Sequence, residues 1–156
     1  MIHSALARFT DADARRAVEG LPRTDYEVVV KPLRYRTSPH LAARCEFEDR
    51  RIVLQVPVPF RSFKEPVIFA ARRKRGAGMR FAWASETVEF RSRRDVLRFL
   101  YLHEWMHWYL REVLGKRSAA ETACDRFALR NFRRRNVSAA DADSALTRQS
   151  LRLKTG

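Results

Sequence analysis

The hydrophobic pattern changes its period near residue 92, which separates a strand-rich first half from a helical second half. In the first half, β-branched and aromatic residues form short runs typical of strands, and these cover residues 26–34, 43–57, 66–72 and 79–91. Glu48-Asp49-Arg50 interrupts the second run and predicts a hairpin turn. The first half thus predicts a mostly antiparallel sheet of about four strands, preceded by a short helix over residues 11–19 that Thr10 can cap.

Helical spacing dominates the second half. From Arg93 to Leu114, apolar residues recur three and four positions apart, which predicts one long helix. Ser92 can cap its first turn and Gly115 can end it. A second helix of roughly 16 residues is predicted between Ser118 and Asn136.

Together these elements predict a single α+β domain over residues 1–137. Residues 138–156 then form a C-terminal tail, for which the pattern predicts at most one loose helix. A chain of 156 residues, of which 46% are hydrophobic, is long and apolar enough to bury one core. We therefore expect a single compact unit.

Composition narrows the function classes. Cys45 and Cys124 are the only cysteines, which excludes a disulfide scaffold and a cysteine-rich zinc module, so any metal must be held by histidine and carboxylate. No run approaches the roughly 18 apolar residues of a membrane span, and residues 1–15 lack the pattern of a signal peptide. We expect a cytoplasmic protein without membrane contact.

The long predicted helix carries the motif with the clearest chemistry. His103-Glu104-Trp105-Met106-His107 is an H-E-x-x-H sequence. Helical residues four apart lie one turn up the same face, so His103 and His107 can aim ring nitrogens at one Zn²⁺ ion. Glu104 then lies beside the metal and can act as general base on a water molecule whose pKa the metal lowers. The sequence predicts a catalytic zinc site.

A third ligand must be a carboxylate, because no histidine follows His107. Glu121 and Asp125 lie four apart on the second predicted helix and share one face. Glu121 also has a structural interpretation, since Ser118-Ala119-Ala120-Glu121 fits a capping box. Only 13 residues separate His107 from Glu121, so Glu121 reaches the metal only if the first helix loosens before Gly115 or the helices cross steeply. Otherwise Asp125 faces the metal, and the residues leave both choices open.

The two motifs together resemble a known family. H-E-x-x-H followed by Glu121-Thr122-Ala123-Cys124-Asp125-Arg126-Phe127-Ala128 is similar to the gluzincin metallopeptidases, and nearest to the ImmA/IrrE family, over about residues 95–132. The resemblance implies a small zincin-like domain with an active-site helix and a glutamate helix. It implies His103, His107 and Glu121 as zinc ligands and Glu104 as catalytic base. Asp125 then accepts a hydrogen bond from a ligand histidine and so fixes its tautomer.

The expected activity is zinc-dependent hydrolysis of peptide bonds in a protein or peptide substrate, as in a metalloendopeptidase. Proteases of this architecture hold substrate by pairing its backbone with an edge strand, and we expect residues 79–91 to supply that strand. The alternative is a basic, nucleic-acid-associated or regulatory binding protein that keeps a zincin shell with a structural or non-catalytic zinc.

The positive charge adds a second candidate partner. Lys and Arg total 32 against 18 for Asp and Glu, a net charge of +14. Two clusters could contact phosphates weakly and without sequence preference: Arg72, Arg73, Lys74 and Arg75, and Arg133, Arg134 and Arg135. The same charge could instead attract acidic proteins or remain a solvated surface.

Overall fold

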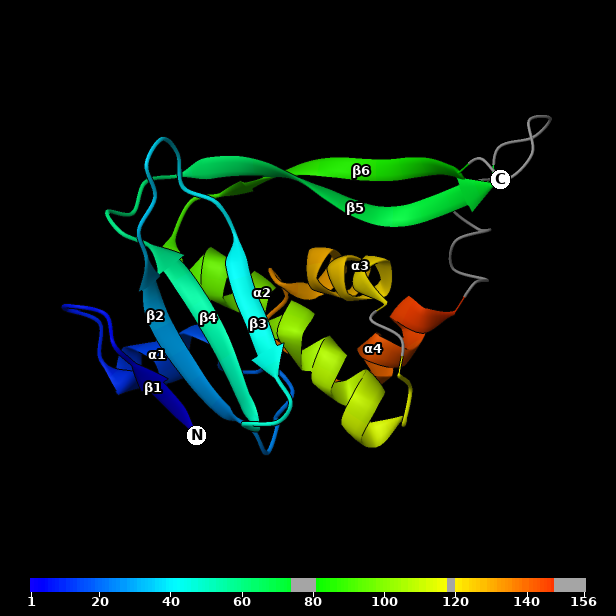
Figure 1. Cartoon of the computed structure of the whole chain (residues 1–156), viewed down its shortest axis with the longest axis horizontal. Helices are drawn as coiled ribbons and strands as arrows, with labels where there is room; N and C mark the ends of the chain where they lie inside the picture. Colours follow the sequence, from blue (N-terminus) through cyan, green and yellow to red (C-terminus); the bar gives the residue numbers. More distant parts are fainter. Residues whose placement is uncertain (74–80, 118–119, 148–156) are drawn as a thin grey trace.

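The computed structural model describes residues 1–73, 81–117 and 120–147, and shows an α+β fold with two separate sheets (Figure 1). One sheet is mixed and the other is antiparallel. In the described part of the chain they accompany four α-helices and one π-helical segment. The α+β class expected from the sequence is confirmed.

The first sheet has four strands in the order β1-β2-β4-β3. These are β1 (Ile2–Ser4), β2 (Glu27–Leu33), β3 (Ala42–Glu46) and β4 (Arg51–Pro57). β2 runs parallel to both β1 and β4, and β3 and β4 alone form the antiparallel hairpin predicted around residues 48–50. The expectation of a mostly antiparallel sheet was therefore wrong for this sheet. Its parallel pairs join strands that are distant in sequence, and α1 lies between β1 and β2. The pattern of apolar residues within one strand does not indicate which distant strand it pairs with.

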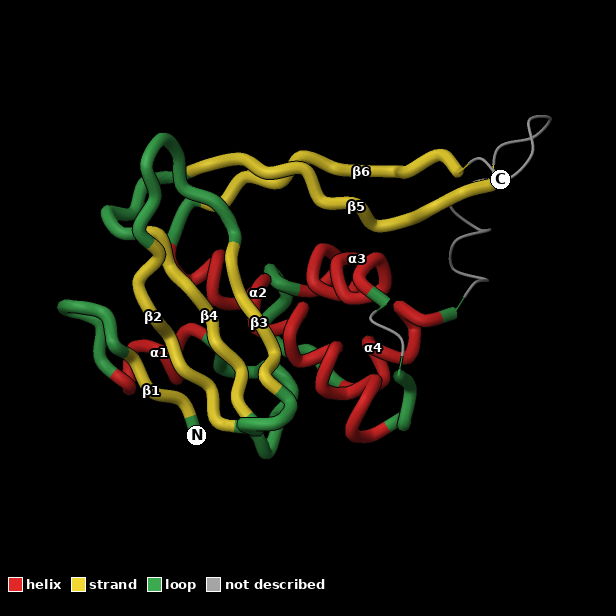
Figure 2. Tube along the Cα trace, in the orientation of Figure 1, coloured by secondary structure: helices red, strands yellow, loops and turns green. Residues whose placement is uncertain are grey.

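The other two expected strands form a sheet of their own. β5 (Phe63–Arg73) and β6 (Phe81–Phe90) make a long antiparallel hairpin with an irregularity between Ile68 and Ala70. Figure 2 shows this hairpin extending past the first sheet, and β5 packs on α3. The predicted single four-stranded sheet is thus divided into two units.

The helices before and after the sheets begin where the sequence predicts. α1 (Asp11–Ala17) is capped by Thr10, and α2 (Arg93–Trp108) is capped by Ser92, whose hydroxyl accepts from the Asp95 N–H at 3.1 Å. The predicted long helix does not stay α-helical to its end. It continues as the π-helix η1 (Tyr109–Val113), in which the N–H of Leu114 donates to the carbonyl of Tyr109.

The last two helices differ from expectation. α3 (Glu121–Asn131) is shorter than predicted, and its N-cap is Ala120, with φ of 44° and no side-chain hydrogen bond. Ser118, the expected cap, lies outside the described residues. α4 (Ala139–Leu146) occupies the expected tail, but its Ala142 and Ala145 are buried in the core. This helix is therefore packed against the domain instead of loose.

A buried arginine joins three parts of the fold. Arg98 on α2 is only 2% exposed, and its guanidinium donates to the carbonyls of Ala17, Glu19 and Phe132 and to those of Arg134 and Arg135. A buried charge is tolerated only when its donors are satisfied, so these bonds hold the ends of α1 and α3 against α2. Within the described residues, no helix has the length and apolar character that a membrane span requires.

Candidate metal centre

Two histidines on α2 face the same point. His103 and His107 lie one helical turn apart, and their Nε2 atoms are 3.3 Å from each other. Each side chain is 13% exposed. Trp105 and Met106, between them in sequence, are buried in the core and hold the helix so that the histidine face is turned outward.

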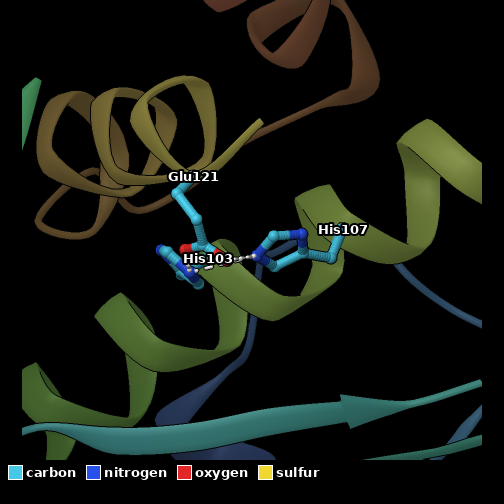
Figure 3. Close-up of side chains that lie close together, drawn as sticks. All are labelled: His103, His107 and Glu121. Carbon is cyan, nitrogen blue, oxygen red and sulfur yellow. Dashed lines mark hydrogen bonds and ion pairs between the residues drawn. The ribbon is translucent and has the colours of Figure 1, made fainter. Parts of the chain in front are cut away.

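Glu121, the first residue of α3, closes the group (Figure 3). Its two carboxylate oxygens lie 3.1 Å from His103 Nε2 and 3.0 Å from His107 Nε2. The chain reaches this position because the α-helix gives way to η1 after Trp108 and ends at Gly115, whose φ is 66°. This is the loosening that the short connection requires if Glu121 is to reach the histidines. The structure thus brings His103, His107 and Glu121 together, with ligand atoms within 4.8 Å of one another.

The donor set fits a zinc ion. Two nitrogens bound to zinc at 2.0–2.1 Å in tetrahedral geometry are about 3.3 Å apart, and the two Nε2 atoms of this structure have that separation. Two imidazole nitrogens and one carboxylate oxygen are donors that zinc accepts. Three protein donors leave one tetrahedral position open, as catalytic zinc sites require.

Asp125 does not face the point where the two Nε2 atoms and Glu121 meet. Its Oδ1 lies 2.8 Å from Nδ1 of His103, on the ring edge opposite to the Nε2 atom that faces Glu121. A proton on Nδ1 shared with Asp125 leaves the Nε2 lone pair free for a metal. Burial lowers the pKa of His103, but hydrogen bonds to Asp125 and Glu121 outweigh it and raise the pKa to about 10. The carboxylates therefore stabilise a cation at Nε2 of His103, which can be a proton or a metal ion that replaces it.

Glu104 lies beside this cluster and is only 5% exposed. Its Oε1 is 3.9 Å from His103 Nε2, too far for a hydrogen bond. Burial, assisted by the charges of Glu121 and Asp125, raises the pKa of Glu104 to about 7, against the opposing effect of His103. A carboxylate with a pKa near neutrality is suited to accept and return a proton.

The cluster opens into a cavity of about 430 Å³ between α2 and β3. β3 and the residue after its end contribute Ala43, Arg44, Cys45 and Phe47 to the wall. Residues 79–91 were expected to supply the strand beside the active site. Residues 79 and 80 lie outside the described residues, and β6, which pairs with β5 in the separate hairpin, does not line this cavity. An edge strand that does line this cavity is β3, which is last in its sheet.

Sequence reasoning missed the opposite wall of the cavity, which is formed by Arg111, Lys116 and Arg117. The position of Arg111, four residues after His107, was the one available signal. The role of β3 had no local signal, because it depends on strand order.

The described residues of the two basic clusters do not line this cavity. Arg72 and Arg73 end β5, whereas Lys74 and Arg75 fall outside the described residues. Arg133 donates to the carbonyl of Glu89, and Arg134 pairs with Asp141 at 3.0 Å. Arg135 follows α3, and its carbonyl accepts from Arg98. Arg133 and Arg134 thus already have partners within the fold.

Comparisons with known proteins do not assign the chain: no family model, curated protein or solved structure matches it. The geometry of the cluster and the cavity is therefore the basis for the function proposed below. The resemblance to gluzincins remains a sequence-based hypothesis.

Proposed function

We propose that the protein is a zinc-dependent metallopeptidase of the gluzincin type. The observation that supports this most strongly is the meeting of two histidine Nε2 atoms and one Glu121 carboxylate beside a buried Glu104, on the wall of an open cavity. In this proposal His103, His107 and Glu121 hold the metal, Glu104 is the general base, and Asp125 orients His103.

When bound, zinc would polarise the substrate carbonyl and lower the pKa of water. Glu104 accepts a proton from the attacking water while the water oxygen adds to the carbonyl carbon. It then gives that proton to the amide nitrogen as the C–N bond breaks, so the products are a carboxylic acid and an amine. The raised pKa of Glu104 supports both transfers.

β3 supports the binding of an extended substrate. It pairs with β4 along one side only, and its residues Ala43 and Cys45 line the cavity that contains the histidines. A peptide that adds to this free edge gains backbone hydrogen bonds whatever its side chains are. Such pairing would lay the scissile bond across the His103–His107 face.

The alternative of a structural zinc is disfavoured by the number of donors. Structural sites use four protein ligands, whereas the cluster within the described residues offers three. A protein that keeps the zincin fold and zinc but only binds partners would show no hydrolysis. The proposed peptidase would show hydrolysis that depends on Glu104.

The test compares the wild-type protein with Glu104→Gln and with Glu86→Gln, a matched change at an exposed residue of β6. Zinc content is measured by mass spectrometry of the metal, and cleavage is measured on a diverse peptide mixture. We expect about one zinc per chain in all three proteins, and a loss of cleavage of about 10²- to 10⁴-fold in Glu104→Gln alone. Cleavage that survives in Glu104→Gln, or no cleavage by the zinc-loaded wild type, would overturn the proposal.

A further inference from the structure

The cavity beside the candidate metal centre has two chemically different ends. One end contains the metal cluster and Glu104, and the other is lined by cationic side chains. The cationic residues are Arg44, Arg111, Lys116 and Arg117. A second cavity, of about 520 Å³, continues from this end and is lined by Arg111, Gly115, Lys116 and Arg117.

Arg111 is the best-placed cation of this group. It follows His107 by four residues and continues the face that His103 and His107 occupy. Its guanidinium carbon lies 4.3 Å from the centroid of the Phe47 ring, on the opposite wall of the cavity. Attraction to the aromatic face holds the guanidinium in place and leaves its N–H groups available as donors.

The charge at this end is not neutralised within the protein. Among the described residues, no carboxylate lies within ion-pair distance of Arg111, Lys116 or Arg117, although the structure pairs several other arginines. Arg44 differs, because its Nε is 2.9 Å from Glu46. Three cations around one opening favour an anionic group from outside.

A carboxylate is the anion that this arrangement fits best. A guanidinium offers a planar fork that matches a carboxylate. Nucleic acid would require cations spread along the path of successive phosphates, whereas these cations converge on one opening that leads to Glu104 and Glu121.

We propose that the substrates of this site carry a carboxylate close to the scissile bond, and that Arg111 binds it with help from Lys116 and Arg117. This inference rests on the proposed peptidase function. Four helical residues from His107 to Arg111 span about 6 Å, which an extended peptide covers in about two residues. The carboxylate is therefore that of an Asp or Glu side chain within about two residues of the cleaved bond, or a free C-terminus at the same distance.

Quenched fluorescent peptides of one core sequence test this assignment. Glu, Gln or Lys is placed at each of the two positions on either side of the scissile bond, and each peptide is made with a free and with an amidated C-terminus. We expect kcat/KM to favour Glu over Gln by about 10- to 100-fold at one of these positions. A preference for the free C-terminus at neutral internal positions would identify the terminal carboxylate as the group that binds.

Substitutions then connect the preference to Arg111. Arg111→Gln should bring the Glu-to-Gln ratio close to one, and Arg111→Glu should favour Lys at the same position. Arg94→Gln, a change to an exposed arginine at the start of α2, is the matched control and should keep the wild-type ratio. Thermal unfolding of each variant shows whether it is folded.

Binding provides a readout that does not depend on turnover. Labelled Glu, Gln and Lys peptides are titrated onto zinc-loaded Glu104→Gln protein and onto the metal-free wild type, with a single-stranded oligonucleotide as competitor. Equal binding of the Glu and Gln peptides would overturn the inference whatever the cleavage result. Oligonucleotide binding that Arg111→Gln weakens, without a Glu preference, would overturn it and assign these cations to nucleic acid.

The two proposals fail in distinguishable ways. Cleavage that requires zinc and Glu104 but ignores the carboxylate leaves the peptidase proposal standing and overturns only the inference. Selective binding of the Glu peptide through Arg111 without any cleavage overturns the peptidase proposal and supports Arg111 as a carboxylate-binding residue.

Discussion

α2 and α3 supply the candidate metal centre in different ways. α2 begins with a side-chain cap at Ser92 and lies in the core, so that His103 and His107 are only 13% exposed. α3 follows Ala120, an N-cap without a side-chain hydrogen bond, and its first residue Glu121 has a side chain that is 64% exposed. The comparison shows that packing fixes the two imidazoles, whereas the third donor depends on how α3 begins.

The largest expected effect comes from the α2 side of this comparison. His103→Ala and His107→Ala each remove one of three donors, so each should abolish stoichiometric zinc binding at micromolar protein concentrations. Metal analysis after dialysis measures this loss. His40→Ala, a change in the loop before β3, is the control and should keep its zinc. Unchanged zinc content in both α2 variants would show that the metal lies elsewhere.

The two carboxylates of α3 should differ from each other. Asp125 contacts the metal cluster only through His103 Nδ1, and loss of such a partner lowers metal affinity by about 10- to 100-fold. Glu121→Ala removes a donor and should lower affinity further than Asp125→Ala does. Competition with a zinc-binding dye gives both constants. The reverse order would make Asp125 the ligand and leave Glu121 as a residue of the helix start.

Zinc should stabilise the two helices unequally. At a free zinc concentration of about 100 times Kd, binding contributes about 2.7 kcal/mol, which raises Tm by roughly 5–10 °C in a domain of this size. Hydrogen exchange should show the greater gain of protection at the start of α3, because Glu121 is the more exposed donor. Equal gains along α2 and α3 would contradict the comparison.

The smallest expected effect concerns Ala120. Its φ of 44° lies in the left-handed region, which costs an alanine about 1–2 kcal/mol and a glycine little. After the greater unfolded-state entropy of glycine is counted, Ala120→Gly should raise the free energy of unfolding by up to about 1 kcal/mol. Ala140→Gly, on the exposed side of α4, should lower it by a similar amount. Urea denaturation measures both, and destabilisation by Ala120→Gly would show that this φ is not under strain.

The sequence predicted features that depend on neighbouring residues and missed those that depend on distant ones. Ser92, Gly115 and the H-E-x-x-H spacing are local signals. The structure has a helix with this cap, and the helical run formed by α2 and η1 stops just before Gly115. Strand order has no such signal. β2 and β4 are neighbours in the sheet although β3 lies between them in the sequence. β1 was missed because three residues are too few for a recognisable run.

The same distinction between local and distant signals applies to the candidate site. The four residues His103, Glu104, His107 and Glu121 were found from spacing and resemblance, and the structure brings them together. The cationic end was missed, because the placement of Arg111 depends on Phe47, which is distant in sequence. The end of α2 was also misjudged. A change from α-helical to π-helical pairing depends on tertiary contacts more than on residue type.

The π-helical segment Tyr109–Val113 makes the candidate centre sensitive to chain length. One residue of an α-helix corresponds to a rotation of about 100°, so deletion of the exposed Val113 would let this turn close as α-helix and rotate everything after it. His103, His107 and Arg111 precede the deletion and would keep their positions, while Glu121 would be turned to another side. A one-residue gap here could therefore remove the third donor while every proposed ligand is still present in the sequence. In homologous chains, the number of residues between His107 and Glu121 is as informative as the identity of the ligands.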